Sequence, residues 1–361
     1  MTAPADRPLK VALVIEDLDV GGAERVVIDT ARELHHRGYH VDVVCLRKSG
    51  RMAWQVTEAG IRLHVMKKRH AVDLLMLRRL VKLLKKLEVD VVHTHMFTAN
   101  TWGRLAAWLG GVPVVVTTEH NVDTWKSFIH LRVDRMLAPC SSKVVAVSDE
   151  VRRFYLEQEQ LDPGQLVTVR NGVDVPETGP AEDVRREFGF ASEDPVFVSV
   201  GRLVEQKAQH LLVEAMARIL PEVPRARLLI VGGGPLEQEL AAQVHQLDLE
   251  GHVVLTGIRT DVARLMSAST ALVMSSRREG LPMVVLEAAS LSVPMLLTAV
   301  GGVAEAVTDG ESALLVPPGS ADVLAEKMTE LAGDPSLRER LGREARRRYV
   351  ERFSLSAMVD A

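Results

Sequence analysis

The sequence predicts an α/β protein made of two doubly wound, parallel-sheet domains, and three observations carry this prediction. Short β-branched runs recur along the 361 residues, and each is followed by a helix-like stretch. The runs are continuously apolar rather than alternating, which is typical of strands buried on both faces. The rhythm breaks once, near the middle of the chain, at a segment rich in Pro, Gly and acidic residues. Repeated strand–helix units form parallel sheets with right-handed crossovers, so we expect one sheet on each side of the break.

The predicted strands fall into two sets. The first half has seven, at residues 11–15, 41–46, 61–65, 89–93, 112–118, 143–147 and 166–169. The second half has six, at residues 195–200, 226–231, 252–257, 271–276, 294–299 and 313–316. Sheets of this type bind ligands at the carboxyl ends of their strands, so the segments that follow strands are the first candidates for function.

The break places the linker near residues 173–182. We therefore expect an N-terminal domain over residues 1–175 and a C-terminal domain over residues 176–345. The end of the chain predicts a charged helix, a break near Phe353-Ser354 and a short apolar piece. We expect this tail, residues 346–361, to pack back onto the N-terminal domain.

Composition and charge exclude several classes of protein. The chain has 44 Lys plus Arg against 48 Asp plus Glu, a net charge of −4, which argues against a general nucleic-acid binder. Residues 1–170 hold 25 basic and 20 acidic side chains, net +5, and the remainder is net −9, so the two halves favour different partners. Two cysteines allow no disulfide framework and no cysteine zinc cluster. The first residues lack the apolar core of a secretory signal, and we expect a cytoplasmic protein.

The first predicted strand leads into a glycine pair. Gly21 and Gly22 let the backbone approach a ligand and open a helix whose N-terminus attracts anions, although a tight turn alone would also need glycine. Asp17 and Asp19 just before them form a D-x-D triplet. We expect these two carboxylates to be solvated surface rather than a metal site.

Histidines follow two other predicted strands of the first half. His93 and His95 come at the end of one strand, where two histidines are a weak zinc signal and a hydrogen-bonding wall of a pocket is the better interpretation. His120 and Asn121 come just past the next strand. Their place at the carboxyl edge of the sheet makes them functional candidates.

A basic amphipathic segment spans residues 67–86, with eight basic residues, one acidic residue and leucines at helical spacing. We expect its leucine face to pack on the sheet. Contact of its basic face with anionic lipid is a further possibility that the charge pattern supports.

In the second half, Arg202 and Lys207 follow the first predicted strand. A planar guanidinium and a point-charge ammonium suit a diphosphate, although an exposed charge pair would look the same. The glycines at 232–234 do not fit G-x-G-x-x-G, and no P-loop motif occurs, which weighs against a nicotinamide or flavin dinucleotide.

The segment 275–290, SSRREGLPMVVLEAAS, is the most informative part of the chain. Pro282 suits the first position of a helix, which places Glu279 in the loop at the helix mouth and Glu287 in its second turn. Free amides at that mouth can bind phosphate. Glu287 lies within an apolar run, where a carboxylate is costly unless it is paired or bound.

Taken in order, GGAER, TEHN, RNGVD, GRLVEQK, VGGGP, EGLPMVVLEA with its E-x7-E spacing, and GG-x-x-E resemble the family 4 glycosyltransferases. The resemblance extends over nearly the whole chain. It implies the GT-B fold, in which two Rossmann-like domains face across a cleft. It also implies an acceptor site in the front domain, a nucleotide-sugar site in the rear domain, and retaining transfer without a metal or cofactor.

The resemblance also implies a role for each matching residue. Glu279 and His120 would lie at the reaction centre, while Gly21, His95 and Asn121 would belong to the acceptor side. The remaining matching residues would bind the nucleotide-sugar donor, through its phosphates, ribose, sugar or base. They are Gly22, Arg202, Lys207, Arg259, Gly280, Leu281, Pro282 and Glu287. Ala208 departs from the family, which often has Gly after the lysine.

The sequence thus predicts a retaining hexosyltransferase that uses a nucleoside-diphosphate sugar. The acceptor would be a lipid-linked glycan or cell-surface polysaccharide precursor at the inner membrane face. Two alternatives remain: a nucleotide-sugar 2-epimerase of the same fold, and a non-catalytic nucleotide-sugar-binding protein. The complete set of Arg202, Lys207, Glu279 and Glu287 argues against the second.

Overall fold

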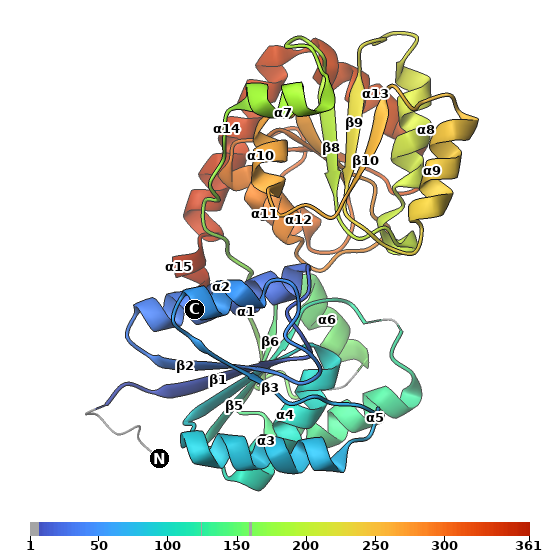
Figure 1. The fold of residues 1–361 in the computed structure, drawn as a ribbon. Helices are drawn as coiled ribbons and strands as arrows, with labels where there is room; N and C mark the ends of the chain where they lie inside the picture. Colours follow the sequence, from blue (N-terminus) through green and yellow to red (C-terminus); the bar gives the residue numbers. More distant parts are fainter. Residues whose placement is uncertain (1–6, 124, 159–160) are drawn as a thin grey trace. The chain divides into compact units, whose positions relative to one another are not determined.

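The computed structural model describes residues 7–123, 125–158 and 161–361 and divides into two compact units, each with its own parallel sheet (Figure 1). Unit 1 ends at Gly172 and also takes in Leu355–Ala361, and unit 2 is Val173–Ser354. The boundary expected from the sequence lies after residue 175, and the expected returning tail begins at residue 346. The tail joins unit 1 later than expected because α14 (Pro335–Arg352) packs against α11 (Met283–Ser290) of unit 2.

Unit 1 has a seven-stranded parallel sheet in the order β3-β2-β1-β4-β5-β6-β7. All seven predicted strands of the first half are confirmed, with shifts of up to two residues at their ends. The largest shift moves the fourth strand to 91–95 and brings His95 into it. The strands are β1 (Lys10–Ile15), β2 (His40–Cys45), β3 (Arg62–Val65), β4 (Val91–His95), β5 (Val114–Glu119), β6 (Lys143–Ala146) and β7 (Leu166–Thr168).

The helices of unit 1 cover both faces of this sheet, as the continuously apolar strands predict. Leu13 and Ile15 of β1 pack in one core with α1 (Gly22–His36) and α2 (Ala53–Glu58). Ala12 and Val14, on the opposite face, pack with α3 (Leu74–Leu87) and α4 (Met96–Gly110). The unit is completed by α5 (Phe128–Leu137), the 3₁₀ turn η1 (Ala138–Cys140), α6 (Asp149–Gln158) and α15 (Leu355–Asp360).

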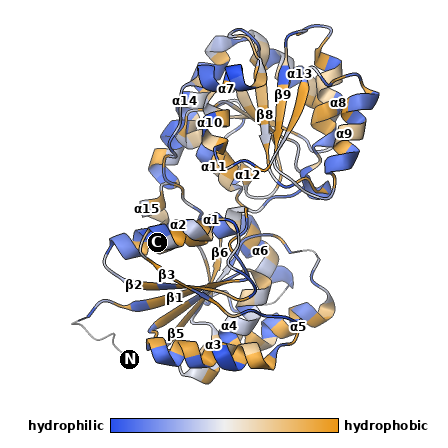
Figure 2. Cartoon of the chain, in the orientation of Figure 1, coloured by the Kyte–Doolittle hydropathy of each residue, from blue (hydrophilic) through white to orange (hydrophobic). Residues whose placement is uncertain are grey.

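The leucine face of the basic segment packs as predicted. Leu80 and Leu84 of α3 are buried, and the Asp73 side chain caps the helix by accepting a hydrogen bond from Met76 N at 2.8 Å. The basic side chains lie on the exposed face, so α3 carries both colours in Figure 2. None of the helices in the described residues is both long and apolar enough to cross a membrane.

Unit 2 has a six-stranded parallel sheet in the order β10-β9-β8-β11-β12-β13. All six predicted strands of the second half are confirmed. They are β8 (Val196–Val200), β9 (Arg227–Val231), β10 (Val253–Gly257), β11 (Ala271–Met274), β12 (Met295–Thr298) and β13 (Leu314–Val316).

One face of this second sheet carries the main core of unit 2. Phe197 and Ile230 pack there with α8 (His210–Ile219), α9 (Glu237–Gln246) and α13 (Ala321–Gly333). The other helical elements of unit 2 are α7 (Ala181–Phe188), η2 (Glu205–Lys207), α10 (Val262–Ser267), α11, α12 (Val303–Ala306) and α14. The predicted break near Phe353-Ser354 is confirmed, because α14 ends at Arg352 and α15 begins at Leu355.

Candidate active site

The predicted donor residues of unit 2 come from loops at the carboxyl ends of its strands. Lys207 lies at the end of η2, after β8, and Glu279 lies in the loop between β11 and α11. Lys207 Nζ donates to Glu279 Oε1 at 2.6 Å, and the Glu279 side chain is only 7% exposed. Two residues that are 72 positions apart in the sequence therefore form one partly buried ion pair.

Glycines allow these loops to pack backbone against backbone. A Cβ on Gly301 would lie 1.8 Å from the carbonyl oxygen of Glu279, and one on Gly232 would lie 1.9 Å from that of Gly201. Gly302 N also donates to Gly280 O at 2.7 Å. The glycine pair at 301–302 thus supports the loop that carries Glu279. In the sequence, the only sign of this role is the Gly301-Gly302 pair, and a simple helix cap would also explain two glycines at that point.

Further hydrogen bonds join the loop after β8 to the loop after β11. Ser275 Oγ donates to Lys207 O at 3.0 Å, and Gln206 Nε2 donates to Arg278 O at 2.8 Å. Arg277 N donates back to Gln206 O at 2.8 Å. These contacts fix the backbone on both sides of the Lys207–Glu279 pair.

The backbone at Ala208 has the conformation that suits the glycine often found at this position in the family. Ala208 is fully buried and has φ of 49°, in the left-handed region that favours glycine.

Two polar side-chain atoms near Ala208, Gln209 Oε1 and Ser276 Oγ, are buried and find no hydrogen-bond partner in the described part of the chain. Buried polar atoms of this kind indicate that water or a ligand supplies the missing partner.

The remaining predicted donor residues differ in exposure. The Arg202 side chain is exposed, Gly280 and Leu281 are buried, and Glu287 is half-buried on the second turn of α11. The helix begins at Met283, so Pro282 is its N-cap rather than its first residue, which corrects the prediction by one position.

Arg259 lies in the loop after β10, and its side chain binds carboxylates of the protein itself. Its guanidinium donates to both carboxylate oxygens of Asp261 at 2.8 Å and to Glu187 Oε1 at 2.5 Å. The Arg259 guanidinium lowers the pKa of Asp261 to about 2. This network ties the loop to α7, a structural role that the sequence did not indicate.

In unit 1, Gly21 and Gly22 are the N-cap and the first residue of α1, as the glycine turn predicts. The preceding aspartates are paired, which corrects the expectation of solvated surface. Asp17 is 7% exposed and accepts from Arg47 Nη2 at 2.6 Å, and Asp19 pairs with Lys48. Gly50, which the sequence analysis missed, has φ of 86° and packs directly on the backbone of Leu18.

His95 and His120 meet at the carboxyl edge of the first sheet. His95 Nδ1 and His120 Nε2 lie 3.0 Å apart, and His93 Nε2 lies 2.7 Å from Thr118 Oγ1. The His95 side chain is 1% exposed, and its Nε2 has no partner among the described residues. The predicted wall of histidines is therefore largely buried. The described residues contain no group of three or more His, Cys, Asp or Glu arranged to hold a metal ion.

Burial sets the charge of these rings. It lowers the pKa of His93 to about 4 and that of His120 to about 3, and it holds the pKa of His95 well below its ordinary value. All three imidazoles are consequently neutral near pH 7. Asn121, next to His120, is half-buried and accepts a hydrogen bond from Val122 N at 3.0 Å.

Two family models match the chain, one over each half. The model "Glycosyltransferase Family 4" matches residues 20–177, and the model "Glycosyl transferases group 1" matches residues 180–348. The boundary between the two matches lies a few residues beyond the boundary between units 1 and 2.

Similar curated proteins include two bacterial sugar-transferring enzymes. The alpha-maltose-1-phosphate synthase of Mycolicibacterium smegmatis is 31% identical over 303 residues, which cover 75% of this chain and 76% of that protein. The UDP-Gal:alpha-D-GlcNAc-diphosphoundecaprenol alpha-1,3-galactosyltransferase of Escherichia coli is 28% identical over 301 residues, which cover 80% and 78%.

Solved structures show the same fold. Anabaena Alr3699/HepE in complex with UDP-glucose superposes with a TM-score of 0.88 at 23% identity, covering 98% of this chain and 97% of that one. WaaG, a glycosyltransferase involved in lipopolysaccharide biosynthesis, superposes with a TM-score of 0.76 at 19% identity, covering 97% of both chains.

Proposed function

The chain belongs to the family 4 glycosyltransferases, and we propose that it is a retaining, metal-independent hexosyltransferase that uses a nucleoside-diphosphate sugar. The acceptor would be a hydroxyl of a lipid-linked glycan or cell-surface polysaccharide precursor. The observation that carries the proposal is the partly buried Lys207–Glu279 ion pair beside the amides that open α11.

The chemistry of transfer explains why these groups would be needed. Breaking the bond between sugar and diphosphate leaves negative charge on the leaving phosphate oxygen. Lys207, Arg202 and the N-terminal end of α11 can stabilise that charge without a metal. Glu279, held by Lys207, would contact the donor sugar, and Glu287 would contact the ribose.

The anomeric configuration would be retained if the acceptor hydroxyl attacked the donor sugar on the same face from which the diphosphate leaves. The acceptor hydroxyl would approach from that side, and the leaving phosphate would accept its proton. His120 is neutral near pH 7 because its pKa is about 3, so we assign it a hydrogen-bonding role toward the reacting groups rather than that of a cation.

Two lines support a lipid-linked acceptor. The Escherichia coli relative is named for an acceptor carried on diphosphoundecaprenol. In this chain, α3 exposes Lys82, Lys85 and Lys86, and two leucines at its start, Leu74 and Leu75, are 68% and 72% exposed. Basic and apolar side chains on one exposed helix suit peripheral binding to an anionic membrane.

A thermal-shift screen tests the donor assignment. The purified chain is melted with UDP, GDP, ADP, TDP or CMP, with and without EDTA. We expect one nucleoside diphosphate to raise the melting temperature by mass action, and EDTA to leave that shift unchanged. Loss of the shift in EDTA would contradict metal independence, and no shift with any nucleotide would contradict the donor site.

Product analysis then separates transfer from the alternatives. The matching nucleotide sugar is incubated with a lipid-linked acceptor, and the anomeric configuration of the product is read by NMR. We expect a new glycoside with the donor's configuration. An epimerised free sugar would indicate the 2-epimerase, and an unchanged donor despite tight binding would indicate the non-catalytic protein.

Vesicle sedimentation tests the membrane contact. Each basic residue near an anionic surface contributes about 1 kcal/mol. Changing Lys82, Lys85 and Lys86 together to Gln should therefore weaken binding to phosphatidylglycerol vesicles about a hundredfold. The same three changes should not affect any binding to neutral vesicles. Equal binding of wild type and variant to the anionic vesicles would contradict the assignment.

A further inference from the structure

A buried lysine lies in unit 1 outside the residues that the sequence analysis selected. Lys126 belongs to the loop between β5, which ends at Glu119, and α5, which begins at Phe128. Its side chain is only 1% exposed. Lysine is almost never buried without specific partners, so this position requires an explanation.

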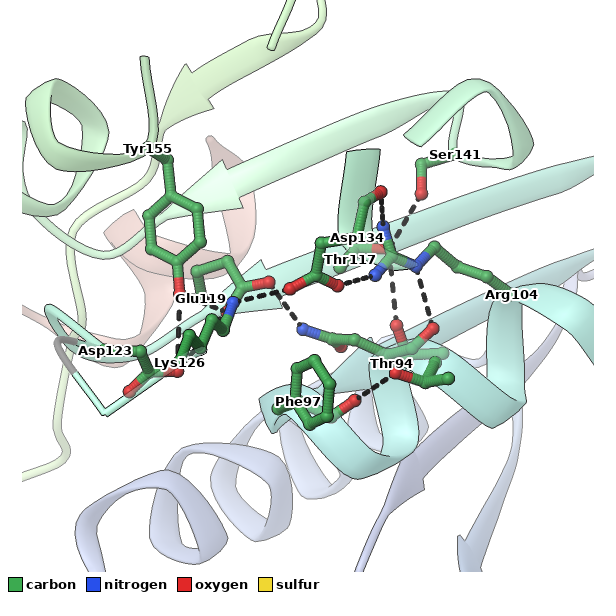
Figure 3. A network of polar contacts seen from close by, with 12 residues as sticks. Thr94, Phe97, Arg104, Thr117, Glu119, Asp123, Lys126, Asp134, Ser141 and Tyr155 are labelled. Carbon is green, nitrogen blue, oxygen red and sulfur yellow. Dashed lines mark hydrogen bonds and ion pairs between the residues drawn. The ribbon is translucent and has the colours of Figure 1, made fainter. Parts of the chain in front are cut away.

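The Lys126 ammonium joins several elements of unit 1 (Figure 3). Its Nζ donates to Asp134 Oδ2 of α5 at 2.7 Å and to the Tyr155 hydroxyl of α6 at 3.1 Å. Glu119 Oε2 and Asp123 Oδ2 each lie 4.0 Å away. The ammonium also lies 4.6 Å from the centre of the Tyr155 ring.

The partners of Lys126 are themselves fixed. Tyr155 donates its hydroxyl proton to Glu119 Oε2 at 2.8 Å, and Asn100 of α4 donates to Glu119 Oε1 at 2.9 Å. Arg104 of α4 forms an ion pair with Asp134. Glu119 is thus held from three sides, and it directly precedes His120 in the sequence.

Stability alone does not account for this arrangement. The attraction within a buried ion pair often does not offset the free energy of removing both charges from water. Replacing such a pair with apolar residues of similar volume therefore often gives an equally stable or more stable protein. Burial also raises the pKa of both Glu119 and Asp123, which is the electrostatic cost of keeping these carboxyls inside. What the network does provide is a fixed position for the start of the loop, where His120 contacts His95.

We propose that Lys126 is a positioning residue, which closes the base of the β5–α5 loop on Glu119 and so holds His120 and Asn121 in place for the acceptor. This inference rests on the proposed function for its kinetic consequence. Its structural content, a buried ammonium network that fixes Glu119 next to His120, does not depend on enzymatic activity.

The main test is the double variant Lys126→Met/Glu119→Gln. Removing one buried cation and one buried carboxylate together keeps the local charge balance, and methionine fills the space of the lysine stem. Lys143→Met is the matched control, because Lys143 lies exposed on β6 of the same unit. We expect kcat for transfer to fall at least thirtyfold in the double variant, with the donor KM and the nucleoside-diphosphate affinity within twofold of wild type. The control should match wild type.

Histidine NMR supplies a readout that does not require catalysis. In wild type, we expect the ring signals of His95 and His120 to show no titration above pH 5. In the double variant, the freed His120 should titrate closer to its ordinary pKa of 6.5. Unchanged titration of His120 in a folded double variant would overturn the proposal, as would a kcat within threefold of wild type. A matching loss of donor affinity would also overturn it, since that would indicate general damage.

A second variant covers the case in which the double variant does not fold. Tyr155→Phe removes the hydroxyl that bridges Lys126 and Glu119 without changing any charge. We expect kcat to fall about fivefold, with donor affinity unchanged, and an unchanged kcat would overturn the proposal. If wild type itself transfers no sugar, the proposed function fails, whereas the His120 titration still tests the positioning by Lys126.

Discussion

At the scale of single residues, the structure brings together Lys207 and Glu279, which the sequence analysis selected separately as donor-site candidates. Removing Lys207 should leave Glu279 buried without its cation and take one positive charge from the donor phosphates. We expect Lys207→Ala to lower kcat/KM about 10²- to 10³-fold, the range typical for loss of one charge-stabilising group. Steady-state kinetics with the cognate donor measure this effect.

The control for that variant is Lys327→Ala. Lys327 also pairs with glutamate in unit 2, through Glu330 at 2.8 Å, but on α13 and with its side chain one-third exposed. Surface pairs contribute little, so both activity and stability should stay near wild type. Equal losses from Lys207→Ala and Lys327→Ala would show that Lys207 has no special role.

The histidines at the carboxyl edge of the first sheet predict how stability responds to acid. Their folded-state pKa values, about 4 for His93 and about 3 for His120, lie below the unfolded value of 6.5. Between these limits the unfolded chain binds more protons, so the free energy of unfolding falls as the pH falls below about 6.5. Each of the two histidines should lower the free energy of unfolding by about 2 kcal/mol between pH 7 and pH 5. Protonation of Glu119 and Asp123, whose folded pKa values are raised, offsets part of this loss.

Urea unfolding of wild type and His93→Gln at pH 7 and pH 5 isolates the histidine contribution. Glutamine does not titrate and can keep a hydrogen bond to Thr118. The variant should therefore lose about 2 kcal/mol less than wild type on acidification. Identical pH dependence of the two proteins would mean that His93 titrates normally in the folded state.

At the scale of elements, the loops at the carboxyl edge of the second sheet depend on glycine for close packing. Gly301 has φ of 53°, and a Cβ there would overlap the Glu279 carbonyl, so Gly301→Ala must displace one of the two loops. We expect a loss of several kcal/mol in the free energy of unfolding or a hundredfold loss of activity. Thermal melting together with kinetics distinguishes the two results.

Gly310→Ala is the matched control for the backbone conformation. Gly310 has a similar φ of 69°, but a Cβ there would meet nothing within 4 Å. Gly310→Ala should lower the free energy of unfolding by about 1–2 kcal/mol, because alanine is strained in the left-handed backbone region. It should leave activity intact. If both variants behaved alike, steric overlap with the Glu279 loop would not be the important factor.

At the scale of the whole molecule, the division into two units predicts that unit 2 can exist alone. Residues 173–354 are continuous in sequence and have their own sheet and core, and they include Arg202, Lys207, Glu279 and Glu287. We expect this fragment to fold and to bind the preferred nucleoside diphosphate within about tenfold of the full-chain affinity. Calorimetry with the fragment and the full chain makes the comparison. A folded fragment that fails to bind would contradict a donor site whose main contacts come from unit 2.

The order of the elements follows from the amino-acid sequence. The thirteen strands of the described residues, their grouping into two parallel sheets and the break at Phe353-Ser354 all follow from local apolar runs and turn residues. The edge of the sheet where function belongs also follows, because parallel strands place all their carboxyl ends together. Lys207 and Glu279 could be selected for this reason before their contact was known.

Which side chains meet and which are buried could be seen only in the folded chain. Lys126 looks like any loop lysine in the sequence, and nothing local indicates that Asp134, Tyr155 and Glu119 converge on it. Gly301 looks like a helix cap until its contact with the Glu279 backbone is seen, and Arg259 looks free until it meets Glu187. The physical reason is that burial and pairing depend on contacts between distant segments, whereas the apolar pattern of a strand is a property of neighbouring residues.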